Sequence, residues 1–91
     1  MTNQSPKIEL LSELIWREMD GNAVVVSPRD GKVRVLNEVG TFIWQLLAEQ
    51  VPRAEIVVHL VETYEVSVLQ AEQDLDKFIN DLLVRGILKY N

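Results

Sequence analysis

The sequence is poor in the residues that most catalytic and cofactor sites require. It has no cysteine, which excludes disulfides, zinc–thiolate sites, iron–sulfur clusters and thiolate nucleophiles. Its four glycines are scattered and form neither a dinucleotide fingerprint nor a phosphate-binding loop. It also lacks a run of about 18 uncharged apolar residues that could span a membrane, and it has no signal-peptide pattern. These absences predict a cytoplasmic protein that binds no cofactor and has no membrane partner.

The remaining composition is that of a small globular domain. The 91 residues are 47% hydrophobic and 25% charged, which is typical of a folded chain. We therefore expect a single domain spanning residues 1–91, with the polar residues 1–7 frayed. Nine basic against fourteen acidic side chains give a net charge of -5, which does not suit a nucleic-acid binder.

The first half of the chain is patterned as β-structure. Residues 8–16 fit either a short strand or a helical turn. Residues 23–26 are rich in valine and residues 32–36 alternate between polar and apolar, which predicts an antiparallel hairpin with a connection of four or five residues. Another strand before the Asp20-Gly21 turn would complete a three-stranded meander.

The second half is patterned as three helices. Asn37 is a favourable N-cap, and the first helix should end near residues 49–50, before Pro52 begins the next. Ser67 and Gln70 have the spacing of a capping box for a third helix, which Gly86 should end. Residues 87–88 fit a final strand or an apolar clasp. The predicted fold is α+β and winged-helix-like, with an N-terminal three-stranded antiparallel β-meander packed on a three-helix bundle.

Catalytic chemistry has little support in this inventory. The single histidine, His59, falls beside Glu55 and Glu62 on the polar face of the second helix, where we expect it to be solvated. A metal site there would lack a second histidine and a sheltered cleft. The sequence therefore predicts a protein that is not an enzyme and that binds no metal.

An alternative function is that of a winged-helix DNA-binding transcription regulator. The helix that would enter the DNA groove carries an excess of acidic side chains, which would repel phosphates. Its acids are Glu72, Asp74, Asp76 and Asp81, and its bases are Lys77 and Arg85.

The charges are unevenly distributed along the chain. Acids and bases balance in residues 1–36, whereas acids are in excess in residues 37–91. Arg29, Lys32 and Arg34 gather on the second arm of the hairpin. These charges either protect a strand edge against self-association or mark a template on which an extended peptide adds as a new strand. Phe78 likewise fits either the core or the wall of a groove beside that edge.

Two parts of the sequence resemble proteins of the PqqD type. The first comprises DGNAVVV (residues 20–26), GKVRVLNEVG (31–40) and IWQLL (43–47), of which the Leu-Asn-Glu-Val-Gly step is the most specific. The second is the pattern at residues 71–72, 74, 78–79, 82 and 86–88. Many relatives have aromatic residues where this chain has Val33-Arg34-Val35, and often a threonine where it has Val51-Pro52.

The resemblance implies a free-standing recognition element for ribosomally synthesised, post-translationally modified peptides. Such a domain binds the leader segment of a precursor peptide and presents it to a separate modifying enzyme, either a leader peptidase or a radical enzyme. It acts in lasso-peptide, pyrroloquinoline quinone or related natural-product biosynthesis. The leader is expected to add as an antiparallel strand in a groove closed by the third helix. On this chain the implied peptide-binding residues are Lys32, Val33, Arg34, Val35 and Leu36 of the strand, and Asp74, Leu75, Lys77, Phe78 and Asp81 of the helix.

Overall fold

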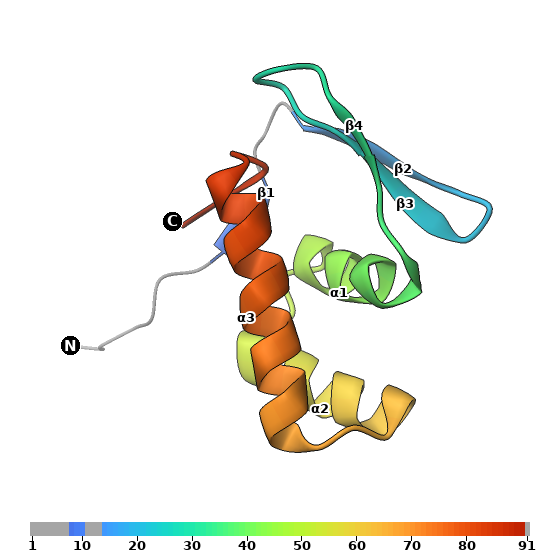
Figure 1. Ribbon diagram of the computed structural model, residues 1–91, viewed down its shortest axis with the longest axis vertical. Helices are drawn as coiled ribbons and strands as arrows, with labels where there is room; N and C mark the ends of the chain where they lie inside the picture. The colour runs from blue at the N-terminus through green and yellow to red at the C-terminus, as the bar shows by residue number, and fades with distance from the viewer. Residues whose placement is uncertain (1–7, 11–13, 91) are drawn as a thin grey trace.

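The computed structural model describes residues 8–10 and 14–90, and the structural statements that follow concern these residues. A three-stranded antiparallel sheet precedes three helices, which confirms the predicted α+β fold (Figure 1). One strand before this series and one strand after it pair with each other and form a second, two-stranded sheet.

The larger sheet is a meander with the strand order β2-β3-β4. Its strands are β2 (Ile15–Met19), β3 (Asn22–Val26) and β4 (Val33–Val35). Asp20 and Gly21 join the first two strands with φ values of 55° and 82°. Positive φ at both positions is what a type I′ hairpin turn requires, and Asp-Gly adopts it readily. Residues 27–32 lie between β3 and β4, and because the Ser27 N–H donates to the Lys32 carbonyl, the four residues 28–31 make the turn, in agreement with the predicted length.

The smaller sheet pairs β1 (Ile8–Leu10) with β5 (Leu88–Tyr90) in antiparallel fashion. Residues 8–16 therefore contain one strand and the start of another, and residues 87–88 lead into a final strand. The predicted fraying of residues 1–7 lies outside the described residues.

The helices are α1 (Glu38–Ala48), α2 (Arg53–Tyr64) and α3 (Val68–Val84). Their predicted start signals are confirmed: Asn37 accepts a hydrogen bond from the Gly40 N–H at 2.8 Å, and Ser67 accepts one from the Gln70 N–H at 3.0 Å. The side chain of Gln70 donates to Asp74 instead, so only one of the two capping-box bonds is seen. Gly86, with a φ of 75°, directly follows Arg85, the C-cap residue of α3, as the sequence predicted for the end of this helix.

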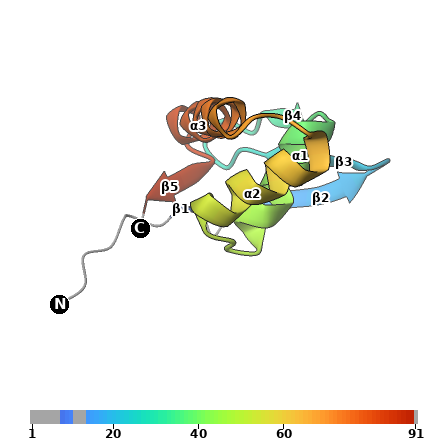
Figure 2. The same ribbon diagram turned by 90° about the horizontal axis from the view of Figure 1, so that it is seen from below.

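The core joins the three helices to the inner face of β3 and to the start of β5. Within it α1 lies against β3, whereas α3 packs on α2 and β5 (Figure 2). Trp44 of α1 is fully buried, and the ring of Trp16 from β2 packs edge-on against it with centroids 5.7 Å apart. The largest fully buried side chains come from both halves of the chain: Trp44, Ile43, Ile56, Leu75, Ile87 and Val25.

A hydrogen-bonded clamp fixes the junction between β4 and α1. The Thr41 hydroxyl accepts from the buried Ala23 N–H at 2.9 Å and donates to the Leu36 carbonyl at 3.3 Å. The Asn22 amide also donates to the Leu36 carbonyl, at 2.7 Å. Because these bonds join β3 to the start of α1, they fix where β4 ends relative to the sheet.

Removing the Thr41 hydroxyl should destabilise the fold. In Thr41→Val the Ala23 N–H stays buried without an acceptor, and we expect the free energy of unfolding to fall by about 1–3 kcal/mol. Urea denaturation measures this change. Thr63→Val is the matched control, since Thr63 is exposed on α2. Equal stability of the two variants would contradict a stabilising role for the clamp.

Candidate functional site

The free edge of β4 exposes main-chain hydrogen-bonding groups. The strand pairs with β3 on one side, and no described strand pairs with it on the other. The Leu36 N–H donates to the Ala23 carbonyl and the Ser27 N–H donates to the Lys32 carbonyl, each at 2.9 Å. In an antiparallel ladder such bonded pairs alternate with non-bonded pairs.

This alternation of bonded and non-bonded pairs, the phase of the ladder, therefore decides which β4 residues direct their main-chain groups outward. Arg34 lies opposite Val25, midway between the two pairs just described, and is the residue whose main chain bonds to β3. The N–H and C=O groups of Val33 and Val35 consequently point away from β3, toward the open edge. These two residues present four unpaired main-chain groups to a further strand.

The side chains of β4 alternate between the two faces of the sheet. Val33 and Val35 are 63% and 68% exposed and point to the outer face, away from the helices. Arg34 is half-buried and shares the inner face with its buried neighbour Val25. Among the β4 residues, therefore, only Arg34 directs its side chain toward the inner side of the sheet.

Two close contacts show which part of the chain lies near the two ends of β4. A Cβ on Gly40 would lie 3.1 Å from Cε1 of Phe78, and one on Gly86 would lie 2.9 Å from Nε of Arg29. Gly40 follows β4 and Arg29 precedes it in the chain. The segment from residue 78 to residue 86, which comprises the end of α3 and the two residues after it, therefore lies near the segments at both ends of β4 and runs in the opposite direction.

Of the five α3 residues that the resemblance implies for peptide binding, two lie in this segment and three lie before it in the helix. Phe78 is half-buried where the segment begins, and Asp81 is exposed one turn further on. Leu75 is fully buried in the core and cannot touch a bound peptide, which corrects its assignment. Asp74 lies one turn before Phe78. Lys77 is exposed, about 100° around the helix from Phe78 and further from the buried stripe.

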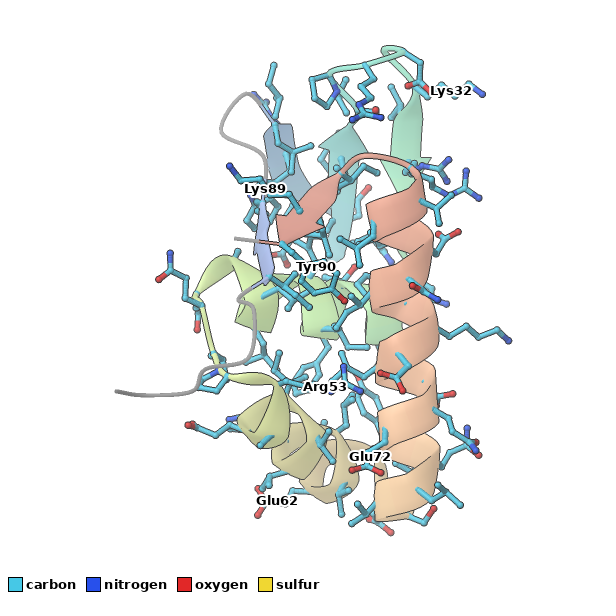
Figure 3. All side chains as sticks on the ribbon, turned by 90° about the vertical axis from the view of Figure 1, so that its left-hand side faces the viewer. Lys32, Arg53, Glu62, Glu72, Lys89 and Tyr90 are labelled. Carbon is cyan, nitrogen blue, oxygen red and sulfur yellow. The ribbon has the colours of Figure 1, made fainter. Side chains whose placement is uncertain are left out.

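The structure adds two basic residues to the same region. Arg29 lies over Gly86, as the contact above shows, and Arg85 forms an ion pair with Asp81 at 2.9 Å. Lys32 extends from the hairpin loop into solvent (Figure 3). Clustered charge in the sequence indicated Arg29, but nothing in the pattern brings Arg85 to the hairpin. The surface around the hairpin loop is therefore basic.

A local hydrogen bond orders the loop that carries these bases. Oδ1 of Asp30 accepts from the Lys32 N–H at 3.0 Å, and the Gly31 N–H donates to the Ser27 carbonyl at 2.9 Å. The bond from the Lys32 amide favours the charged carboxylate and lowers the pKa of Asp30 below 3.8.

The Asp30 carboxyl should titrate below 3.8, and the Lys32 amide should report the same midpoint. A lowered folded-state pKa means that this stabilising contribution is present above the unfolded pKa and is lost as the pH falls through the folded value. NMR titration of the carboxyl and amide shifts measures both. In Asp30→Ala the Lys32 transition should disappear, and an Asp30 midpoint of 3.8 or higher would contradict this description of the loop.

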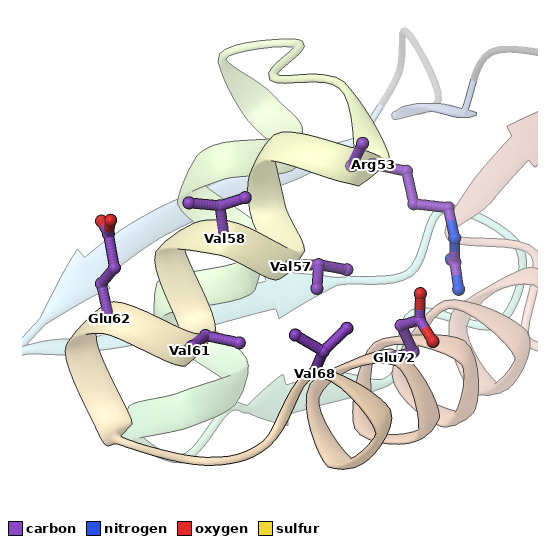
Figure 4. Close-up of a pocket in the computed structure, with 8 residues that line it drawn as sticks. Arg53, Val57, Val58, Val61, Glu62, Val68 and Glu72 are labelled. Carbon is purple, nitrogen blue, oxygen red and sulfur yellow. The ribbon is translucent and has the colours of Figure 1, made fainter.

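A hollow lies between α2 and α3 (Figure 4). Its volume is about 470 Å³, and Val57, Val61 and Val68 point toward one another in it. On one side of this hollow, Arg53 of α2 forms an ion pair with Asp76 of α3. The hollow is mainly apolar and does not gather reactive side chains.

Neither a metal site nor a membrane span is found in the described parts of the chain. His59 is exposed, and no group of three or more His, Cys, Asp or Glu side chains among residues 8–10 and 14–90 could hold a metal ion. Within the same residues, no helix is long and apolar enough to cross a membrane.

The free sheet edge beside a helix is the geometry of a strand-adding peptide-binding domain. The family model for coenzyme PQQ synthesis protein D (PqqD) matches residues 22–88, and the chain belongs to this family. The match includes β3, β4 and all three helices, and so the whole candidate site.

Two solved structures share the fold over nearly their whole length. One is TbiB1 in complex with the TbiA(beta) leader peptide, which is 27% identical, with a TM-score of 0.85 over 89% of this chain and 94% of that one. The other is lasso peptide synthetase B1 complexed with the leader peptide, which is 25% identical, with a TM-score of 0.84 over 91% of this chain and 98% of that one. The comparison with curated proteins gave no significant match.

Proposed function

We propose that this chain is a non-catalytic module that binds the leader segment of a ribosomally synthesised precursor peptide. The leader adds to β4 as an antiparallel strand and is presented to a separate modifying enzyme, such as a leader peptidase, in lasso-peptide or related biosynthesis. The observation that carries the proposal is the outward direction of the Val33 and Val35 main-chain groups beside α3. The leader peptides bound by the two similar proteins support it.

Main-chain bonding alone does not account for tight binding. Four hydrogen bonds at about 0.5–1.5 kcal/mol each give about 2–6 kcal/mol, whereas micromolar affinity needs about 8 kcal/mol. The remainder must come from guest side chains that face α3, where Phe78 is half-buried and offers apolar surface. Contact between the guest and α3 is thus as necessary to the proposal as the open edge.

Amide hydrogen exchange tests strand addition residue by residue. Candidate precursors are to be sought among short reading frames beside this chain's gene and titrated into the isotope-labelled protein. We expect the Val33 and Val35 amides to exchange quickly in the free protein and slowly in the complex. The Arg34 amide already bonds to β3 and should be protected in both states. Protection that appears instead at the α2–α3 hollow would contradict the proposed site.

Replacing Val35 by proline should weaken leader binding at least about tenfold. The substitution removes an N–H that faces the open edge, not one that bonds to β3, so the sheet keeps its own ladder. A tenfold loss corresponds to about 1.4 kcal/mol, near the value of one hydrogen bond. Isothermal titration calorimetry measures the change.

Val35→Thr is the matched control, since it keeps the N–H and the β-branched shape at an exposed position. Its affinity should stay within about twofold of the original. Circular dichroism establishes that both variants are folded. If a folded Val35→Pro protein bound the leader as tightly as Val35→Thr, β4 would not be the strand that receives the peptide.

A further inference from the structure

The guanidinium of Arg34 has an unsatisfied donor beside the open edge. Its Nε atom is buried and has no hydrogen-bond partner among the described residues. The two ion pairs among the described residues join Asp81 to Arg85 and Asp76 to Arg53, and neither includes Arg34. No described carboxylate pairs with Arg34. Two other buried side-chain polar atoms among the described residues also have no partner, Oγ of Ser27 and Nε1 of Trp44, but of the three only Arg34 lies on the strand with the open edge. A buried N–H without an acceptor is uncommon in folded proteins, and at this edge a bound peptide can supply the missing acceptor.

The ladder phase places one guest residue next to this donor. Because Val33 and Val35 make the main-chain bonds to the guest, the guest residue directly opposite Arg34 belongs to a non-hydrogen-bonded pair. In such pairs the Cα atoms are about 4.5 Å apart and the side chains are closest. Directly opposite residues share a face, so this guest side chain points inward, alongside Arg34.

The charges around this position favour an acidic guest residue. Arg29 and Lys32 lie on the hairpin loop that leads into β4, with Arg29 next to Gly86, and Asp81 near the end of α3 is already paired with Arg85. A carboxylate opposite Arg34 would meet a guanidinium fork without competition from that acid. Arginine binds a carboxylate through two parallel N–H bonds more specifically than it binds a neutral group.

We infer that Arg34 is a specificity-determining residue that selects a glutamate or aspartate in the leader, at the position directly opposite it in the added strand. This inference rests on the proposed function and names the chemistry of one leader position. Arg34 thereby contributes recognition of a side chain, while Val33 and Val35 contribute the sequence-independent main-chain bonds.

A displayed library of random 12-residue peptides provides the probe. Selection on the original protein should enrich apolar residues and one acidic position. Selection on Arg34→Met, which keeps the apolar stem but no donor, should enrich the apolar residues without the acid. Selection on Arg34→Glu should replace the acid by lysine or arginine. Arg17→Met is the matched control, because Arg17 lies on β2, on the outer face of the sheet, and its loss should leave the acid enriched.

A selected peptide and its Glu→Gln counterpart then give the magnitude. The original protein should bind the glutamate form about tenfold more tightly, and Arg34→Met should bind both forms equally. The position is fixed by NMR, since a non-hydrogen-bonded antiparallel pair brings the two Hα atoms together: the selected acid should show an Hα–Hα contact with Arg34. Arg34→Lys serves as the second variant if Arg34→Met does not fold, and it should reduce the preference because it lacks the fork.

The possible outcomes distinguish a failure of this inference from a failure of the proposed leader-binding function. If library peptides slow exchange at Val33 and Val35 but show no acid preference that depends on Arg34, the inference is wrong and the function stands. An acid preference with its Hα contact at another residue also overturns it. If no library peptide or candidate precursor protects these amides, both fail.

Discussion

The hydrogen-bonding phase of the β3–β4 ladder is the constraint on which the candidate site depends. With Arg34 bonded to Val25, the main-chain groups of Val33 and Val35 face outward and the Arg34 side chain faces inward. A slip of one residue would reverse all of this, because side chains and main-chain groups both alternate with a period of two. The phase is held at both ends, by the Thr41 clamp on Leu36 and by the loop bond between Ser27 and Lys32.

Much of this architecture could be predicted from the sequence, because turns and helix ends are specified by residues within a few positions of them. The Asp20-Gly21 turn, the Asn37 and Ser67 caps and Gly86 at the end of α3 each act within a few residues. The strands in residues 8–16 could not be assigned in this way. Residues 8–10 form a strand by pairing with residues 88–90, which lie at the other end of the chain, and no local pattern encodes that partner.

The site was harder to derive than the fold for a similar reason. Alternation in residues 32–36 shows that Val33 and Val35 share a face but not which face, and residues 24–26 are all valine, so β3 does not settle the phase either. Burial of Leu75 and the approach of Arg29 to Gly86 depend on how α3 is rotated and how far it extends past the hairpin. The resemblance supplied the strand and the helix, and packing decided which residues of each can act.

Edge protection and peptide capture are compatible on this strand, because Arg34 serves both. Two copies that paired through β4, in antiparallel fashion and centred on residue 34, would place one Arg34 directly opposite the other in a close, non-hydrogen-bonded pair. Like charges in that position oppose association, and inward-pointing charges are a recognised means of protecting sheet edges. A guest with a carboxylate at the same position reverses the sign of the interaction. One side chain can thus disfavour a second copy of the chain and favour a complementary peptide, which lets β4 keep an exposed, valine-rich edge.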